Sequence, residues 1–228
     1  GLVNNAGLGG LGLIATWTEE ELLEIFDVNA IAPIRLSQAC LPLLVRSGGR
    51  IVNIGSQGGS ISKRYFGPYT MTKHALEAFT VALDEELAPY GVRVSIVQPG
   101  GVSTAMGQNS MPSMLERFRR ARAPFEEEAA EIVGAITAPP EPEPEPTEEG
   151  GDQPPPESED HRTPSHPEIV ATAVLDALFS PNPRLRYLVG TRWEGERVIR
   201  VLLDRLLDAN DCPSIRDPIE KLEAQLRQ

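Results

Sequence analysis

Short β-strand-like runs alternate with longer amphipathic segments along most of this chain, and this alternation restricts the fold more than any other feature. The short runs are bounded by glycine, serine or proline, and the segments between them carry apolar residues at helical spacing. Strands are predicted at 2–5, 50–55, 92–97 and 186–190, with helices at about 18–45, 68–87, 111–136, 165–179 and 194–208. Pro33 is expected to kink the first helix. Strands separated by helices pair in parallel, so the sequence predicts an α/β domain with a mostly parallel sheet.

One segment does not follow this pattern. Residues 139–160 contain nine acidic residues, eight prolines and no lysine or arginine. A segment of that composition cannot bury enough apolar surface to fold, so 138–164 is predicted to be a disordered Pro/Glu-rich insertion. The domain is expected to resume with closing elements at 165–208, followed by a helical tail at 209–228.

The net charge of −12 comes mainly from the same insertion, because the other 24 acidic residues nearly balance the 21 basic ones. An acidic chain is a poor general ligand for nucleic-acid phosphates. Cys40 and Cys212 do not make a disulfide framework in a chain of 228 residues, and no His or Cys pair has metal-ligand spacing. No apolar run approaches the ~18 residues of a membrane span. We therefore expect no nucleic-acid partner, no metal and no membrane span, and a cytoplasmic location.

Tyr69 and Lys73 are four positions apart in the predicted helix 68–87, so both side chains project from one face of it. A phenol has a pKa of ~10, and lowering it by ~3 units requires ~4 kcal/mol of preference for the phenolate. An ammonium at ~4 Å supplies about that much at an effective dielectric constant of ~20. The pair is therefore sufficient as an acid/base device, although this spacing is also common on helices without function.

Two more residues have a functional and a structural interpretation. Ser56 follows the strand 50–55, and the carboxyl ends of parallel strands line the ligand crevice of an α/β sheet. A serine after a strand also commonly caps a turn. Asn29 lies inside the first helix, where asparagine is not favoured for its own sake, and its alternative is a solvated helical side chain.

Asn4-Asn5-Ala6-Gly7, Asn29, Ser56, the Tyr69/Lys73 pair and Pro99-Gly100 resemble, in order and spacing, the short-chain dehydrogenase/reductase family. The resemblance covers about 1–135 and resumes at about 165–205, without the Pro/Glu insertion. It implies that 1–137 form the catalytic part of a Rossmann-type doubly wound parallel sheet that 165–208 complete. The family's phosphate-binding glycine loop precedes this point, so we expect a longer protein with roughly 80 further residues, at ~30 or more for each βαβ unit.

The resemblance also implies a role for each matched residue. Tyr69 exchanges a proton with the substrate oxygen, and Lys73 lowers the Tyr69 pKa and binds the nicotinamide ribose. Ser56 holds and polarises the substrate oxygen, and Asn29 helps to hold a water for proton relay. The implied cofactor is NAD or NADP, and the selector between them lies in the expected upstream region. The implied cofactor contacts are Asn5, Ala6, Gly7, Tyr69, Lys73, Pro99, Gly100, Val102 and Thr104.

The activity implied by the resemblance is the NAD(P)-dependent interconversion of an alcohol and a ketone or aldehyde. The segment from 186 onward loosely resembles the retinol and hydroxysteroid dehydrogenases, which favours an apolar small-molecule substrate. The family also implies a homo-oligomer. The alternative is a non-catalytic binding or scaffold fragment that lacks the cofactor-binding half, with an unpaired edge at the strand 2–5.

Three other patterns favour simpler interpretations. Residues 7–12 fit G-x-G-x-x-G, but five residues separate them from the next helix, which predicts a loop rather than a dinucleotide fingerprint. Ile54 stands where a serine-hydrolase elbow needs glycine. The arginines of the segment 117–122 are predicted to form a solvated helix face, balanced by the acidic residues 126–128.

Overall fold

The computed structural model describes residues 1–138, 163–210, 218, 221 and 224. The predicted insertion, apart from its edges, and most of the predicted tail lie outside these residues. Between the described strands and helices lie short turns at 14–16, 57–59 and 88–90. The longer elements, in chain order, are β1 (Leu2–Asn4), α1 (Glu19–Phe26), a π-helical turn (Asp27–Ile31), α2 (Ala32–Ser47), β2 (Arg50–Ile54), α3 (Gly67–Leu87), β3 (Arg93–Pro99), α4 (Met106–Arg119), α5 (Glu126–Thr137), α6 (Glu168–Phe179), β4 (Arg186–Val189) and α7 (Arg192–Asn210).

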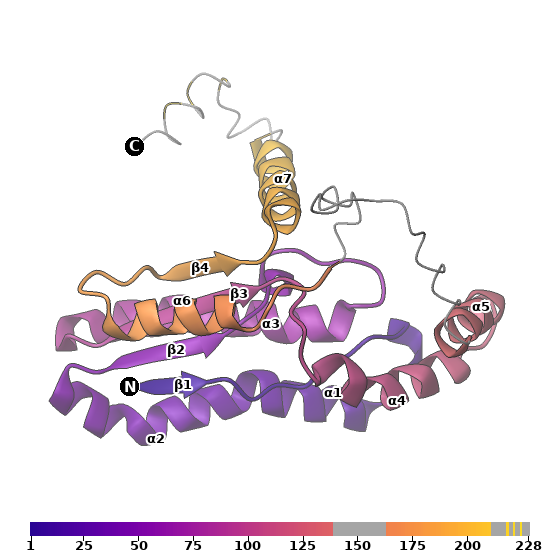
Figure 1. The fold of residues 1–228 in the computed structure, drawn as a ribbon, viewed down its shortest axis with the longest axis horizontal. Helices are drawn as coiled ribbons and strands as arrows, with labels where there is room; N and C mark the ends of the chain where they lie inside the picture. The colour runs from indigo at the N-terminus through magenta and orange to yellow at the C-terminus, as the bar shows by residue number, and fades with distance from the viewer. Residues whose placement is uncertain (139–162, 211–217, 219–220, 222–223, 225–228) are drawn as a thin grey trace, which may run out of the picture.

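The described strands form one parallel sheet in the order β1-β2-β3-β4 (Figure 1). Asn53 of β2 lies opposite Asn4 on one side and Ile96 on the other, which fixes the register of the sheet. The inner strands β2 and β3 are almost wholly buried, as strands covered on both faces must be. The predicted α/β class and parallel sheet are confirmed.

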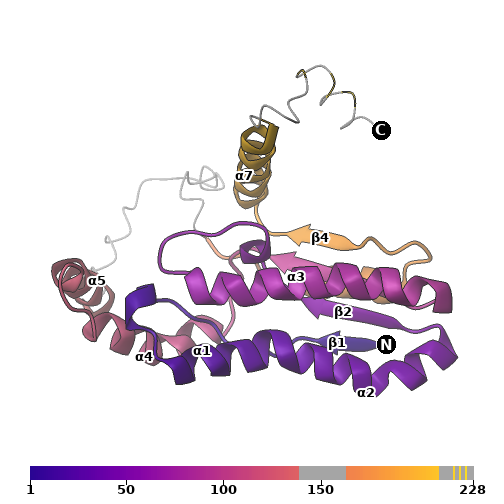
Figure 2. The ribbon, with the colours of Figure 1, turned by 180° about the vertical axis from the view of Figure 1, so that it is seen from behind.

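Helices cover both faces of this sheet, with α6 on one face and α2 and α3 on the other (Figures 1 and 2). Successive strand residues point to opposite faces, so Ile51 packs under α2 and α3 while Val52 packs under α6. Two apolar layers result. The first consists of Leu44, Ile51, Leu83, Leu87, Val92 and Val94, and the second of Val52, Val97, Ala173, Ala177 and Tyr187.

Two predicted helices differ in the structure. The segment predicted as one helix at 111–136 consists of α4 and α5, separated by a break at 120–125. The first helix is continuous from Glu19 to Ser47, and its irregularity is a π turn directly before Pro33. In that turn the Ala32 N–H donates to the carbonyl of Asp27, five residues earlier. A bend in a helix is typical of such a widened turn, and the kink expected at Pro33 stays a prediction.

The same helix bears on the expected lack of a membrane span. Glu19–Ser47 is 29 residues long, and its most apolar stretch of 18 residues has a mean hydropathy of 1.4, enough to cross a membrane by length and composition alone. The stretch is not an unbroken apolar run, because Arg35 and several polar residues lie within it. Core helices pass the same test, and Leu44 of this helix packs in the core. Among the described residues, one such helix is weak evidence for a membrane span.

Candidate active site

The strand ends bring the candidate residues to one edge of the sheet. All strands are parallel, so their carboxyl ends share the edge where α/β proteins bind ligands. β1 ends at Asn4, directly before the predicted cofactor contacts at 5–7. β2 ends two residues before Ser56, and the turn 57–59 that follows packs against α3, which carries Tyr69 and Lys73.

Ser56 caps a turn, and its predicted role toward a substrate stays a prediction. Its Oγ accepts the backbone N–H of Gly58 at 3.0 Å, which makes it a turn cap. The same side chain lies close enough to Tyr69 to lower the pKa of its phenol. A Cβ on Gly58 would lie 3.3 Å from Ser56 Oγ and 3.5 Å from Tyr69 Cε1, so a glycine here leaves the pair in contact.

The electrostatics of Tyr69 differ from the expectation. Burial raises the pKa of the Tyr69 phenol, and the nearby Ser56 hydroxyl lowers it by less, so the net direction is upward. Burial acts in this direction because a low-dielectric site disfavours the phenolate. Lys73 is not among the groups that shift the pKa of Tyr69 in this structure, so the expected lowering by Lys73 is not seen.

Lys73 lies behind Tyr69 on α3 and is almost fully buried, with 4% of its surface exposed. Its Nζ donates to the carbonyl oxygen of Ile54 at 2.9 Å and lies 5.8 Å from the centre of the Tyr69 ring. Burial lowers the pKa of Lys73 to about 8. The ammonium is thus held at the end of β2 with its positive charge destabilised, beside Tyr69.

Asn29 lies in the π turn and is 1% exposed. Its Oδ1 accepts the N–H of Leu8 at 2.7 Å, and its Nδ2 donates to the carbonyl of Leu8 at 2.9 Å and to Thr72 Oγ1 at 3.1 Å. Thr72 in turn donates to the carbonyl of Tyr69. These bonds use both amide protons, so the side chain joins the glycine turn to α3. The solvated-helix interpretation of Asn29 is wrong, and the water-holding role stays a prediction.

The predicted cofactor contacts fall into two groups. Gly7 is at the centre of the first group, because a Cβ there would lie 3.4 Å from Asn29 Oδ1 and 3.7 Å from Lys73 Nζ. Asn5 and Ala6, beside it, are exposed. The second group follows β3: Pro99 and Gly100 are half-buried, Val102 pairs with Ser165, and Thr104 Oγ1 accepts the Met106 N–H at 3.4 Å. The structure therefore gathers Ser56, Tyr69, Lys73, Asn29 and Gly7 at one place and puts the second group on a neighbouring strand end.

The family model described as short chain dehydrogenase matches residues 1–114. The chain belongs to the short-chain dehydrogenase family. It is 38% identical over 133 residues to the mitochondrial D-beta-hydroxybutyrate dehydrogenase of Bos taurus, a match that covers 58% of this chain and 38% of that protein. It is 45% identical over 101 residues to retinol dehydrogenase 5 of Mus musculus, which covers 44% of this chain and 31% of that protein. The chain thus matches less than half the length of either relative.

Solved short-chain dehydrogenases also share the fold. A short-chain dehydrogenase from Streptomyces avermitilis superposes with a TM-score of 0.67 at 24% identity, over 94% of this chain and 69% of that one. A Burkholderia cenocepacia short chain dehydrogenase in complex with NADP gives a TM-score of 0.60 at 21% identity, over 95% and 69% of the two chains. At these identities the likeness shows the Rossmann-like fold alone.

The residues of this chain fit the nicotinamide end of NAD(P). Within the described parts of the chain, Lys73 Nζ donates only to Ile54, so two of its three N–H groups are available to ribose hydroxyls. The space beside Gly7 that a Cβ would fill, and the exposed Asn5 and Ala6, open to the same edge. When bound, the cofactor supplies the hydride chemistry. The glycines at 7–12 lead into a short turn at 14–16, and α1 starts only at Glu19, so the predicted loop is confirmed there.

The short-chain dehydrogenase also contains an ion cluster that the sequence analysis misjudged. Arg117 of α4 was expected to be solvated, yet it is 6% exposed, with its guanidinium 3.6 Å from the centre of the Trp17 ring. Arg117 and Arg120 both pair with Glu21 of α1, at 3.1 and 2.7 Å. The pattern did not reveal this because Glu21 is 96 residues away in sequence. The cluster anchors α4 to the start of α1.

We expect Arg117→Met to lower the free energy of unfolding by about 2 kcal/mol, as the loss of a charged hydrogen bond to a partly buried partner does. Chemical denaturation of the whole protein measures this. Arg119→Met is the matched control, because Arg119 lies on the same helix and is exposed. Equal stability of the two variants would contradict an anchoring role for Arg117.

Proposed function

We propose that the whole protein is an NAD(P)-dependent oxidoreductase that interconverts an alcohol and a ketone or aldehyde. The gathering of Ser56 and Tyr69 beside Gly58, with Lys73 buried next to them, carries this proposal. In the proposed reaction the Tyr69 phenol exchanges a proton with the substrate oxygen, and Ser56 orients that oxygen. Lys73 binds the nicotinamide ribose and supplies the positive charge that favours the phenolate.

We further propose that the substrate is apolar and uncharged. Similarity to proteins named retinol dehydrogenase 5 (45% identical) and 3beta-hydroxysteroid dehydrogenase dhs-16 from Caenorhabditis elegans (36% identical) supports this class. The segment around α4 and α5 supports it as well, because its packing is apolar. Its buried members are Leu13, Met114, Phe118, Ala121 and Ala129.

The charges of the same segment argue against an anionic substrate such as a hydroxy acid. A carboxylate in a dry site needs a free cationic partner. Arg117 and Arg120 of α4 are both paired with Glu21, and Arg64 is paired with Glu128 of α5. These guanidiniums are therefore committed to carboxylates of the protein itself.

A substrate panel tests the proposal. We expect the whole protein, incubated with NAD⁺ or NADP⁺, to oxidise retinol or a 3β-hydroxysteroid, with formation of the reduced nicotinamide as the readout. D-3-hydroxybutyrate, taken from the name of the bovine relative, serves as the charged comparison. We expect a kcat/KM at least about tenfold lower for it, the discrimination produced by a little over 1 kcal/mol.

The outcomes separate the parts of this proposal. A preference for hydroxybutyrate would overturn the apolar substrate and leave the dehydrogenase chemistry in place. A lack of saturable NAD(P)H binding by the whole protein would overturn the enzyme itself and favour the non-catalytic scaffold.

A further inference from the structure

The junction between β4 and α7 contacts both walls of the candidate active site. The carbonyl of Val189, the last residue of β4, accepts the N–H of Gly100 at 2.8 Å and the side-chain amide of Gln57 at 3.3 Å. Gln57 directly follows Ser56, and Gly100 begins the loop of the second group of predicted cofactor contacts. One carbonyl therefore links the serine turn to the loop at the end of β3.

Glu194, in the first turn of α7, makes a second link. Its Oε2 accepts the N–H of Thr191 at 2.9 Å, and the Glu194 N–H donates to Thr191 Oγ1 at 3.3 Å. This is a capping box, which by itself is an ordinary way to start a helix. The capping box uses one carboxylate oxygen, and the other, Oε1, accepts the N–H of Gly101 at 2.6 Å. That bond reaches across 93 residues of sequence.

Two glycines make room for this carboxylate. A Cβ on Gly100 would lie 2.3 Å from Glu194 Oε2, and a Cβ on Gly190 would lie 2.4 Å from the same atom. Contacts of that length are impossible, so any larger residue would displace the carboxylate. Gly190 also has a φ of +146°, which other residues rarely adopt. The Glu194 carboxylate therefore leaves room for glycine at position 100 and for no larger residue.

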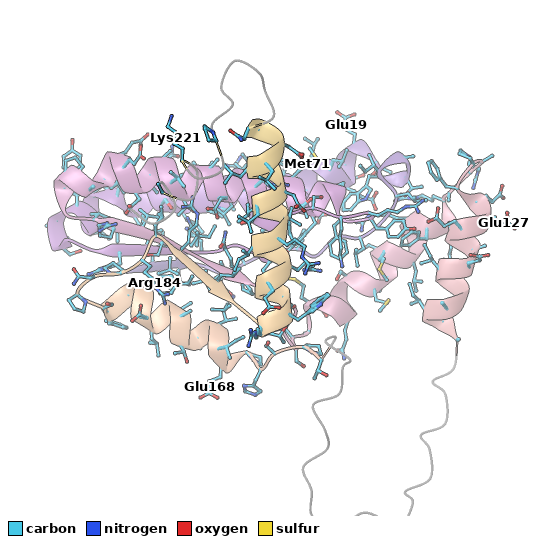
Figure 3. The ribbon with its side chains drawn as sticks, turned by 90° about the horizontal axis from the view of Figure 1, so that it is seen from above. Glu19, Met71, Glu127, Glu168, Arg184 and Lys221 are labelled. Atoms are coloured by element: carbon cyan, nitrogen blue, oxygen red, sulfur yellow. The ribbon has the colours of Figure 1, made fainter. Side chains whose placement is uncertain are left out.

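The loop 100–104 is also held from its other side. The N–H of Ser165 donates to the carbonyl of Gly101 at 2.8 Å, and the N–H of Ser103 donates to the carbonyl of Ser165 at 3.0 Å. α7 itself runs across the direction of the strands and away from the sheet (Figures 1 and 3). Further along this helix, Arg205 donates to the carbonyl of Ser60, just after the serine turn. The helix thus contacts the loops after β2 and after β3.

We propose that Glu194 is a positioning residue, which clamps the loop 100–104 against the end of β4 and so fixes the nicotinamide side of the site relative to Ser56 and Tyr69. The inference rests on the proposed function for its effect on turnover. Its structural part, the clamp on the loop, does not depend on that function. Glu194 touches neither Ser56 nor Tyr69 by any contact in the described structure, so it acts through the loop backbone.

Hydrogen exchange tests the clamp independently of activity. In Glu194→Gln one carboxylate oxygen becomes an amide that cannot accept, so one of the two N–H groups loses its partner. We expect amide exchange of the segment 99–104 in the whole protein to become at least about tenfold faster, the factor that corresponds to the loss of one hydrogen bond. Glu196→Gln is the matched control, since Glu196 is exposed, lies on the same helix and pairs only with Arg192 in the described structure. Exchange at 99–104 that is equal in both variants would overturn the proposal, whether or not the protein is a dehydrogenase.

Kinetics test the positioning role. A misplaced loop is expected to raise the KM for the nicotinamide cofactor and to lower kcat by about tenfold in Glu194→Gln, because small displacements of reacting groups are costly. The pH midpoint of kcat is expected to stay unchanged, since Tyr69 and Lys73 are untouched, and Glu196→Gln is expected to match the wild type. Altered exchange with wild-type kinetics would overturn the positioning role.

A double-mutant cycle gives the sharpest test. Gly100→Ala should speed exchange at 99–104 in the presence of Glu194, because the new Cβ meets its carboxylate; exchange is the readout, since Gly100 is itself a predicted cofactor contact. In a Glu194→Ala background the same change should have little further effect. If Gly100→Ala has an equal effect in both backgrounds, Glu194 is not the reason for the glycine and the clamp is refuted. A wild-type protein without NAD(P)-dependent activity would refute the proposed function alone, and the exchange data would still decide on the clamp.

Discussion

Replacing Tyr69 with phenylalanine is expected to lower the turnover of the whole protein by about a thousandfold, within the range that general acid–base groups contribute. The substitution removes the phenol oxygen that Ser56 contacts and keeps the ring in its half-buried position. Lys73 remains bonded to Ile54, so the nicotinamide affinity is expected to change by less than about threefold, under 1 kcal/mol. Steady-state kinetics with the best substrate of the panel, together with a cofactor titration, measure both quantities.

Tyr90→Phe is the matched control for Tyr69→Phe. Tyr90 is 61% exposed, and it lies beyond the far end of α3 from Tyr69, so its phenol has no part in the site. We expect wild-type rates for this control. Rates for Tyr69→Phe within a few-fold of the wild type would remove Tyr69 from the acid/base role and, with it, the main support for the proposed reaction.

The second large effect concerns the stability contributed by Lys73. Its pKa is about 8 in the folded protein against 10.5 in the unfolded chain, so the unfolded chain binds more protons between these two pH values. The free energy of unfolding therefore rises with pH across this window. Below pH 8 both states are protonated, and the folded state bears the full cost of a buried charge. The difference between these two pKa values corresponds to about 3 kcal/mol in the free energy of unfolding.

Lys73→Met isolates this contribution, because methionine fills a similar volume without a charge. Relative to the wild type, the variant is expected to lose about 3 kcal/mol of stability between pH 8 and 10.5, since only the wild type gains from deprotonation. Urea denaturation across that range measures the difference. Lys63→Met is the control: Lys63 is exposed, and its replacement is expected to give a smaller pH dependence. A stability difference for Lys73→Met that does not vary with pH would show that the lysine is not buried as described.

Much of the fold could be predicted from the sequence, because the deciding signals are local. Each described strand overlaps a short run predicted as a strand, and α3 and α6 follow apolar residues at helical spacing. The break between α4 and α5 and the π turn at 27–31 were not predicted. Both are small irregularities within segments whose overall periodicity remains helical, and periodicity does not resolve them.

The candidate site, too, could be predicted from the sequence only in part. Tyr69 and Lys73 share a helix face, and their proximity follows from helical geometry. The partners of Asn29, Arg117 and Glu194 do not follow from any spacing, because each pairs with a residue between 21 and 96 positions away. For such residues the type alone allowed a solvated side chain, and only the packing of the chain excluded it.

The amino-acid order by itself determined where most of the strands and helices lie, and that a phenol, an ammonium and a serine hydroxyl lie near one sheet edge. Those outcomes depend on periodicity and on the parallel connection of neighbouring elements. The tertiary structure decided the electrostatic balance: burial raises the pKa of Tyr69 and lowers that of Lys73. It also decided that Glu194 meets Gly101. Burial and long-range contacts are properties of the packed chain, since they depend on which distant segments exclude water from a given atom.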